Sequence, residues 1–167
     1  MISKGLTVIK ELPVFRVYSP QQRLPISALF RILGLNDNKG EYAGDICHAL
    51  RLEMACDVDI ELLGSVKGID PLDTITIISE RYVRPASFYE TLLLLRISKL
   101  RRYESLIGKI AVLDTEWSRV AAERRFILLA KDGYGWKFTL FSPYQIMDSS
   151  LIIPCVTGEY SRQSRRG

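Results

Sequence analysis

The sequence contains a single histidine, His48, and three cysteines, Cys47, Cys56 and Cys155, none spaced as Cys-x-x-Cys. One histidine excludes a histidine-rich metal site and leaves little material for a Ser-His-Asp centre. Thiols without that spacing argue against a disulfide framework and against a zinc ribbon. Neighbouring helical residues point about a third of a turn apart, so Cys47 does not pair with His48 as nucleophile and base. We expect His48 to be an ordinary surface or core-edge histidine.

The short motifs that mark common enzyme classes are also missing. The chain has no Gly-x-Ser-x-Gly, His-Glu-x-x-His, Gly-x-Gly-x-x-Gly or protein-kinase sequence. Residues 131–135, Lys-Asp-Gly-Tyr-Gly, lack the Gly-Lys-Ser/Thr ending of a phosphate-binding loop, and they predict a hairpin turn instead. These absences favour a protein without catalytic residues, metal or cofactor.

No uninterrupted apolar run approaches the roughly 20 residues that a membrane-spanning helix needs. Any membrane contact is therefore expected to be peripheral. The length of 167 residues and the hydrophobic content of 47% suit one compact domain with its own core. We assign residues 1–160 to that domain and residues 161–167, Ser-Arg-Gln-Ser-Arg-Arg-Gly, to a basic mobile tail.

The formal net charge of +4 is unevenly distributed along the chain. Residues 1–80 hold 8 basic and 11 acidic side chains, whereas residues 81–167 hold 15 and 8. Solvated surface accounts for any single one of these charges. Together, an acidic half and a basic half can attract anionic surfaces, and they can attract another copy of the chain head to tail.

The first third of the chain carries one strand pattern followed by two helix patterns. Residues 7–18 predict an edge strand or two short strands, because Pro13 interrupts them and cannot donate to a sheet ladder. Pro25 and Gly34 bracket an apolar stretch in the way that punctuates a short helix. Residues 45–55 carry apolar side chains at helical spacing and predict a second helix.

Strand patterns dominate the remainder. Residues 57–62 alternate between apolar and acidic side chains, which predicts a half-buried strand. Residues 74–78 are rich in Thr and Ile and predict another strand, and residues 88–97 predict a long central strand. Residues 101–108 predict a turn and residues 117–123 a short helix.

Residues 126–141 place two apolar strands around a polar, glycine-containing turn, which predicts a β-hairpin. The order of these elements predicts the α+β class. We expect an antiparallel sheet, with helices from the N-terminal third packed on it and a C-terminal β-hairpin.

One face of the strand over residues 57–62 carries carboxylates only. The three residues are Asp57, Asp59 and Glu61. Alternation alone explains them as a solvated strand face. They could instead hold a hard cation such as Ca²⁺, although no glycine-containing ligand loop accompanies them. As a third interpretation, they form an acidic face for self-assembly that docks onto a basic patch of a neighbouring copy.

Basic side chains gather in the second half of the chain. We take as a candidate patch Arg96, Lys99, Arg101, Arg102, Lys109, Arg124 and Arg125. Tyr103 and Trp136 lie between them in the sequence and could add stacking or an interfacial anchor. Such a patch suits phosphate groups of lipid head groups or of nucleic acid, bound electrostatically and in a salt-sensitive way. No signature of an RNA-binding fold accompanies it, so we do not expect sequence-specific readout.

Two segments together resemble rhabdovirus matrix proteins over about half of the chain. Residues 126–138, Phe-Ile-Leu-Leu-Ala-Lys-Asp-Gly-Tyr-Gly-Trp-Lys-Phe, are similar to the last hairpin of the vesiculovirus matrix core. Upstream, Arg84-Pro85, then Tyr89 and the expected strand through Ile97, resemble the family's Arg-Pro, Tyr and long apolar strand. The compact length resembles the members from plant-infecting viruses, and no Pro-Pro-x-Tyr motif is present.

The resemblance implies a structural protein of the virion that lies beneath the envelope and also occurs in the host cytoplasm and at the cytoplasmic membrane face. Its implied partners are other copies of itself, the viral nucleoprotein–RNA complex and an anionic membrane surface, with no small-molecule substrate. The implied roles are self-assembly, condensation of the helical nucleocapsid and budding. A small viral or phage nucleic-acid-binding or inhibitor protein, acting through the basic C-terminal half, is the alternative. A metal-dependent enzyme built on the acidic strand face is a third hypothesis.

Overall fold

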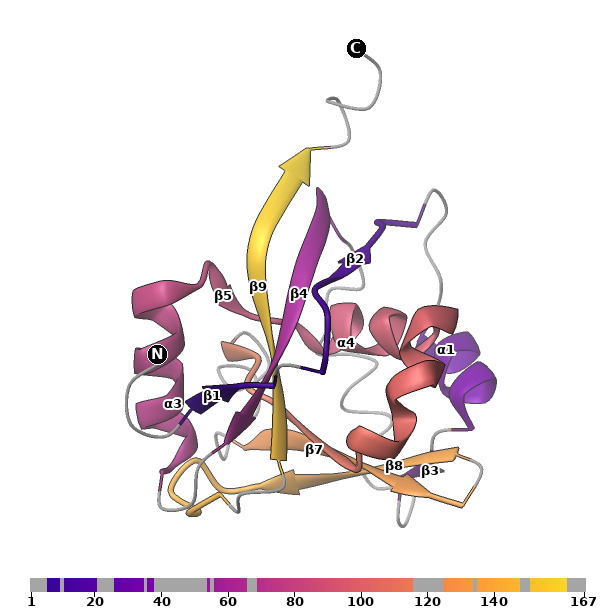
Figure 1. Ribbon diagram of the computed structural model, residues 1–167. Helices are drawn as coiled ribbons and strands as arrows, with labels where there is room; N and C mark the ends of the chain where they lie inside the picture. The colour runs from indigo at the N-terminus through magenta and orange to yellow at the C-terminus, as the bar shows by residue number, and fades with distance from the viewer. Residues whose placement is uncertain are drawn as a thin grey trace.

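The computed structural model describes residues 6–9, 11–20, 26–34, 36–37, 54, 56–65, 69–115, 125–133, 135–147 and 151–161. In these segments nine strands form one open, mixed sheet, and helices cover it (Figure 1). The predicted α+β class is confirmed. The predicted helices at 45–55 and 117–123 lie outside the described residues, apart from Met54, as does the tail beyond Ser161.

Two long strands form the centre of the sheet. β4, Cys56–Ser65, pairs antiparallel with β9, Leu151–Ser161, and a bulge between Asp59 and Ile60 interrupts the register. The alternation in β4 buries Val58, Ile60 and Leu62, as its sequence predicts. β9 was not foreseen from the sequence. Its first six residues are buried, and its last part projects beyond the body beside β4 (Figure 1).

Short strands extend both sides of this pair. β1, Leu6–Val8, and β2, Phe15–Val17, both pair with β4, which confirms two short strands around Pro13. β5, Arg84–Pro85, pairs with β9.

The other half of the sheet contains the predicted hairpin. β7, Phe126–Asp132, and β8, Gly135–Phe141, pair over their full length. β6, Lys109–Val112, joins β7 to β9 and runs parallel to β9, and β3, Asn36–Asp37, is parallel to β8. The sheet is therefore mixed: these two pairs are parallel, whereas the other pairs are antiparallel, as expected. After the hairpin the chain crosses back and enters the sheet as β9. It then runs in the same direction as its neighbour β6.

Two segments predicted as strands are helices. α3, Pro71–Arg81, replaces the strand expected at 74–78. Asp70 caps it by accepting a hydrogen bond from the Asp73 N–H (2.9 Å), and Pro71 occupies the first turn, where proline is tolerated. The helix-start signal of Asp70 and Pro71 outweighs the preference of Thr and Ile for strands.

α4, Phe88–Leu95, replaces the central strand expected at 88–97. All eight of its residues are buried, so the sequence shows no amphipathic helical period. The cap is visible in the sequence, however, as Ser87-x-x-Glu90, a reciprocal capping box. The turn expected at 101–108 is largely a 3₁₀ helix, η1, Ser98–Leu106.

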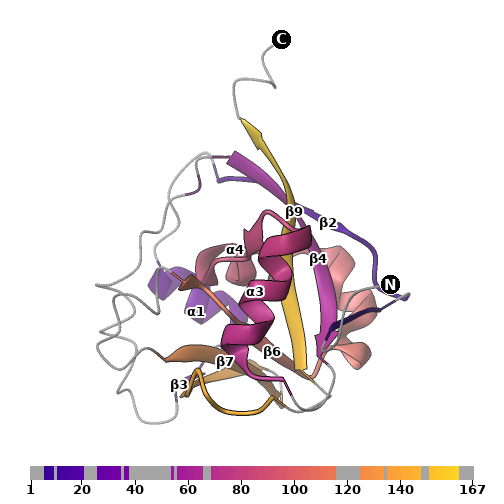
Figure 2. The ribbon, with the colours of Figure 1, turned by 90° about the vertical axis from the view of Figure 1, so that its left-hand side faces the viewer.

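The helices lie on both sides of the β4–β9 pair. Figures 1 and 2 show α3 on one side and α4 with α1, Ile26–Leu33, on the other. Each side has its own apolar cluster, one including Ile78 of α3 and the other including Leu94 of α4. Among the described residues, the helices that cover the sheet are α1, from the N-terminal third as predicted, and α3, α4 and η1, from residues 71–106, where no helix was predicted. The predicted helix between Pro25 and Gly34 is confirmed.

The close approach of α1 to the hairpin supplies a stability prediction. Gly34 ends α1 with a φ of 60°, and its carbonyl accepts a hydrogen bond from Trp136 N (3.3 Å). A Cβ at Gly135 would lie 2.2 Å from that same carbonyl oxygen. We expect Gly135→Ala to lower the free energy of unfolding by about 1–3 kcal/mol, because the helix end and the strand must move apart. Urea unfolding followed by circular dichroism measures this loss.

Gly108→Ala is the matched control for that experiment. A Cβ at Gly108 meets nothing within 4 Å, so its effect is expected to stay within about 0.5 kcal/mol. Equal losses for the two variants would contradict the close approach.

Candidate functional site

The first of the three β4 carboxylates is not on the surface. Asp57 is only 2% exposed and accepts a hydrogen bond from the backbone N–H of Ser19 (2.8 Å). The Ser19 hydroxyl in turn donates to the carbonyl of Met54 (2.8 Å). Asp57 therefore fixes the chain that follows β2. The interpretation of all three carboxylates as one solvated face is wrong at this position, because the segment after β2 covers the strand.

The second carboxylate is satisfied within its own chain. Asp59 forms an ion pair with the Arg16 guanidinium, and the Tyr160 hydroxyl donates a hydrogen bond to it (2.9 Å). The Arg16 guanidinium also lies 4.1 Å from the centre of the Tyr160 ring. The hydrogen bond from Arg16, followed by that from Tyr160, lowers the pKa of Asp59 below its usual value. This cluster ties β2 to the projecting part of β4 and β9.

Glu61 is half-buried and lies near Tyr82. Burial, together with the nearby Glu61 charge, raises the pKa of Tyr82 to about 12. Among the described residues, no group of three or more His, Cys, Asp and Glu side chains is arranged to hold a metal ion. The structure thus does not bring the β4 carboxylates together as a cation site. Their docking onto a neighbouring copy stays a prediction.

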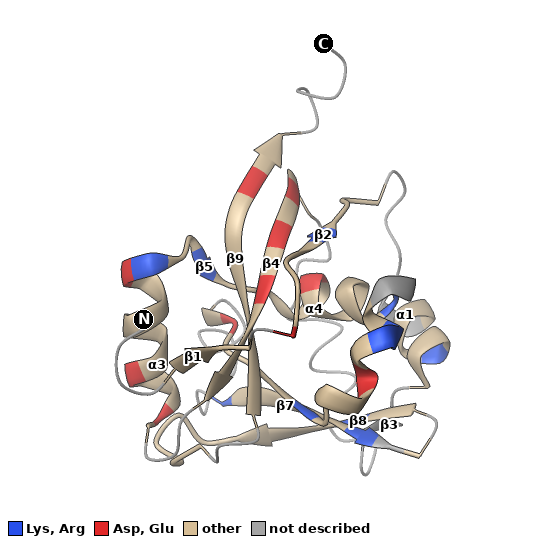
Figure 3. Ribbon diagram, in the orientation of Figure 1, with Lys and Arg blue, Asp and Glu red and all other residues tan. Residues whose placement is uncertain are grey.

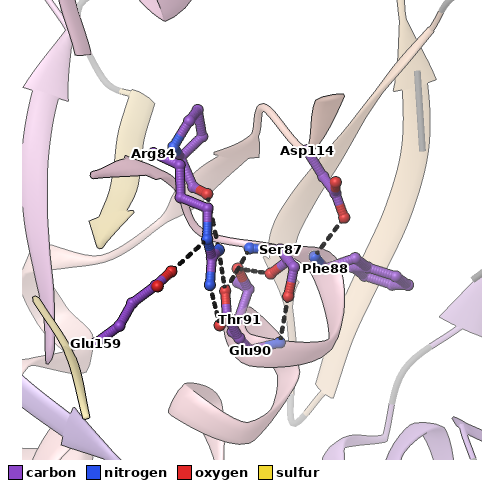
Figure 4. Close-up of polar contacts among 8 residues, drawn as sticks. Arg84, Ser87, Phe88, Glu90, Thr91, Asp114 and Glu159 are labelled. Atoms are coloured by element: carbon purple, nitrogen blue, oxygen red, sulfur yellow. Dashed lines mark hydrogen bonds and ion pairs between the residues drawn. The ribbon is translucent and has the colours of Figure 1, made fainter. Parts of the chain in front are cut away.

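A dense polar network joins β5, α4 and β9 (Figure 4). Arg84 donates to both carboxylate oxygens of Glu90, at 2.7 Å each, and its Nε donates to Glu159 (2.9 Å). Glu90 is only 3% exposed. The hydrogen bonds from Arg84 to Glu90 are the main cause of a raised pKa of the Arg84 guanidinium.

The same network closes the N-terminus of α4. Glu90 accepts a hydrogen bond from Ser87 N (2.8 Å), and the Ser87 hydroxyl accepts one from Glu90 N (3.1 Å). Asp114 accepts from Phe88 N (3.0 Å). The carboxylate of Glu90 thus serves as both helix cap and ion-pair partner. The Arg84-Pro85 motif of the resemblance therefore has a structural role here, and no pattern in its sequence predicted that role.

The basic residues around η1 lie on the surface. Arg96 is exposed at the C-cap of α4, Arg101 and Arg102 are exposed in η1, and Lys109 is exposed at the start of β6. We call these four residues the η1 basic surface. Figure 3 shows basic positions on η1 and α1 at the lower right, away from the acidic positions of β4 and β9 above. The side chain of Lys99 and the whole of Arg124 lie outside the described residues.

The predicted basic patch is not continuous. Lys109 is paired with Ala130 of β7, whereas Arg125 lies five residues before Ala130, roughly 17 Å along the strand. Arg125 therefore belongs to the other end of the β6–β7 ladder. Lys131, which is not one of the residues of the predicted patch, lies on the Lys109 side, because its N–H donates to the carbonyl of Gly108 (2.9 Å).

The aromatic residues near this surface are not platforms for stacking. Trp136 is only 5% exposed and belongs to the core cluster, with the Lys131 ammonium 5.3 Å from its ring centre. Tyr103 is half-buried, and its ring contacts Phe15 edge to face, at 6.0 Å between centroids. The interpretation of Trp136 as an exposed anchor is therefore wrong. The groups that the η1 basic surface exposes are its charged side chains.

The described thiols are poorly suited to nucleophilic chemistry. Cys155 is buried and Cys56 is half-buried, and neither forms a disulfide. Burial raises the pKa of both thiols, so the thiolate form is disfavoured. Cys47 and His48 lie outside the described residues. In the segments that the structure describes, no helix is long and apolar enough to cross a bilayer.

No known protein family matches the sequence, and neither a curated protein nor a solved structure matches the chain. The resemblance to rhabdovirus matrix proteins stays a prediction. Its hairpin forms as β7 and β8, whereas the segment compared with a long apolar strand forms α4.

Proposed function

We propose that this chain is a viral matrix protein, a non-enzymatic structural protein that self-assembles, condenses the helical nucleocapsid and links it to the inner face of the envelope. The observation that carries the proposal is the η1 basic surface, which exposes three guanidinium groups and one ammonium within residues 96–109. The hairpin resemblance supplies the viral context.

The chemistry of this surface suits phosphate-bearing partners. Arginine presents a planar fork of donors that matches phosphate oxygens, and it stays charged at every physiological pH. Each basic residue near an anionic membrane contributes about 1 kcal/mol of attraction, which falls off within a Debye length. Neutralised phosphates also release counterions, so binding to a nucleocapsid weakens steeply with salt.

Reversing two charges on the η1 basic surface tests the proposal. We expect Arg101→Glu with Arg102→Glu to weaken association with anionic liposomes by at least about thirtyfold, since the loss of about 2 kcal/mol corresponds to that factor. Liposome co-sedimentation at ~0.15 M salt measures the change, because exposed charges still interact over about 8 Å there.

The control is a charge reversal of equal size elsewhere. Single Arg101→Glu and Arg81→Glu variants have the same net charge, but Arg81 lies in α3 on the other side of the molecule (Figure 1). Only the Arg101 variant is expected to lose binding. Equal losses would show that net charge rather than this surface governs association, and unchanged binding of the double variant would contradict the proposal.

Self-association distinguishes the matrix function from the alternative. A matrix protein is expected to form larger species in sedimentation velocity as salt is lowered. A nucleic-acid-binding or inhibitor protein would instead bind naked RNA tightly without binding liposomes or itself. A chain that stays monomeric at low salt and high concentration would refute the matrix proposal.

A further inference from the structure

The turn between β8 and β9 exposes two large apolar side chains. Tyr144 is 73% exposed and Ile146 is 58% exposed. We call Tyr144 and Ile146 the β8–β9 knob. Large apolar side chains that protrude together are a common sign of an interaction site.

The knob is held in place by its backbone. Gln145 N donates to the carbonyl of Ser142 (3.1 Å), and Tyr144 N donates to the Ser142 hydroxyl (3.2 Å). Met147 is buried, and its N–H donates to the carbonyl of Ile69 (2.9 Å), which fastens the turn to the start of α3. A turn fixed in this way loses little conformational entropy on docking.

A hollow elsewhere on the molecule has the complementary character. Its volume is about 570 Å³, and it opens among β1, the end of β4, the end of η1 and the starts of β6 and β9. Its apolar wall is formed by Ile9, Leu106, Leu151 and Ile152. Leu106 is 46% exposed, so part of this wall faces solvent.

Charge distinguishes the two surfaces. Lys109 and Lys131 line the hollow. The knob lies beside the first turn of α3, which carries Asp70 as its N-cap and the exposed Asp73. An acidic surround is unfavourable for insertion into an anionic membrane, but it complements a hollow lined by lysines.

We propose that the β8–β9 knob of one copy inserts into the hollow of the next copy, so that Tyr144 and Ile146 contact the apolar wall while Asp70 and Asp73 face Lys109 and Lys131. This inference rests on the proposed self-assembly and names its interface. A knob and a hollow at different places on one chain make a heterologous contact, which generates rings or open filaments.

Truncation of the knob is the first test. We expect Tyr144→Ala with Ile146→Ala to weaken self-association on the order of a hundredfold, as for two interface anchors. Sedimentation velocity at low salt measures it. Both side chains are exposed, so the melting temperature and binding to anionic liposomes are expected to stay unchanged. The control is Tyr18→Ala with Ile32→Ala, a pair with exposed fractions of 61% and 58% that lies outside the interface.

A mixing experiment tests the head-to-tail geometry. Leu106→Glu places a charge on the wall of the hollow and leaves the knob intact. The knob variant and the hollow variant are each expected to be monomeric alone. Mixed in equal amounts they are expected to form a heterodimer that does not grow, because one functional knob meets one functional hollow.

The outcomes separate this interface from the proposed function. Wild-type protein that never self-associates overturns both. Wild-type protein that self-associates, together with a knob variant that does so equally well, overturns the interface and leaves the matrix function standing. Mixed variants that stay monomeric, or that grow into long species, contradict the knob-in-hollow contact.

Discussion

Replacing Arg84 with alanine is expected to lower the free energy of unfolding by about 3–5 kcal/mol, because it leaves a buried carboxylate without its counter-ion. The Glu90 side chain is 4% exposed and receives two 2.7 Å hydrogen bonds from Arg84. The Arg84 side chain is 37% exposed, so water can enter the vacated space and the lower end of the range is expected. Urea unfolding monitored by circular dichroism measures the loss.

Three further variants define the origin of that loss. Arg84→Lys keeps the charge but removes the fork that matches both carboxylate oxygens, so we expect it to recover only part of the stability. In a double-mutant cycle with Glu90→Ala, we expect the double variant to lose at least about 1 kcal/mol less stability than the sum of the two single losses. Arg96→Ala, an exposed arginine at the end of α4, is expected to change stability by less than about 0.5 kcal/mol. A loss below about 1 kcal/mol for Arg84→Ala would contradict the role of the buried pair.

Truncation of the hairpin tryptophan is expected to be equally severe. Trp136→Ala should lower the free energy of unfolding by about 3–5 kcal/mol, as for other buried large-to-small substitutions. The ring is 5% exposed and packs in the larger apolar cluster, so its removal leaves a cavity beneath β8. Because tryptophan is itself the fluorescent probe, far-ultraviolet circular dichroism is the appropriate readout.

Trp136→Phe and Lys131→Ala separate the contributions at this position. The phenylalanine keeps an apolar ring and is expected to recover most of the stability. Lys131→Ala removes the ammonium 5.3 Å from the ring and the 3.3 Å ion pair with Glu104, and we expect it to cost no more than about 1 kcal/mol. A loss below about 1 kcal/mol for Trp136→Ala would contradict the buried position of the ring.

Local patterns predicted the elements whose two faces differ. β4 alternates between apolar and acidic side chains, and the β7–β8 hairpin carries a glycine-containing turn between two apolar strands. In β4 the period of two reflects how the strand lies in the sheet, whereas the turn between the two apolar runs identified the hairpin. The short helix between Pro25 and Gly34 is likewise marked at both of its ends.

Elements buried on every side could not be identified from periodicity. α4 has no polar face, and an apolar run of eight residues fits a central strand as well as a buried helix. Only the capping box of Ser87 and Glu90 distinguishes the two. β9 was missed for a different reason, because Pro154 and Gly158 are residue types that are uncommon inside strands. Pro154 lies between the residues that pair with β6 and those that pair with β5, where the neighbour in the sheet changes.

Some relations among the candidate site residues could be predicted from the sequence, and others could not. Sequence proximity located the exposed arginines of η1, because a short helix keeps neighbours together. It could not show that Asp57 is covered by the segment after β2, or that Arg125 lies at the far end of a strand from Lys109. Those relations depend on pairings between distant parts of the chain. The β8–β9 knob and the hollow likewise needed the assembled structure.

The position of β9 has a consequence for how the protein folds during its synthesis. The strand between the two halves of the sheet, β9, is the last of the described strands in sequence, and its pairing with β4 joins residues such as Cys56 and Ser161. A nascent chain that has not yet exposed residues 151–161 can form the β6–β7–β8 unit but cannot connect it to β4. Such distant pairings slow folding, since loop-closure entropy must be overcome before the contacts form. The chain therefore stays incompletely folded, with apolar strand edges exposed, until residues 151–161 have left the ribosome.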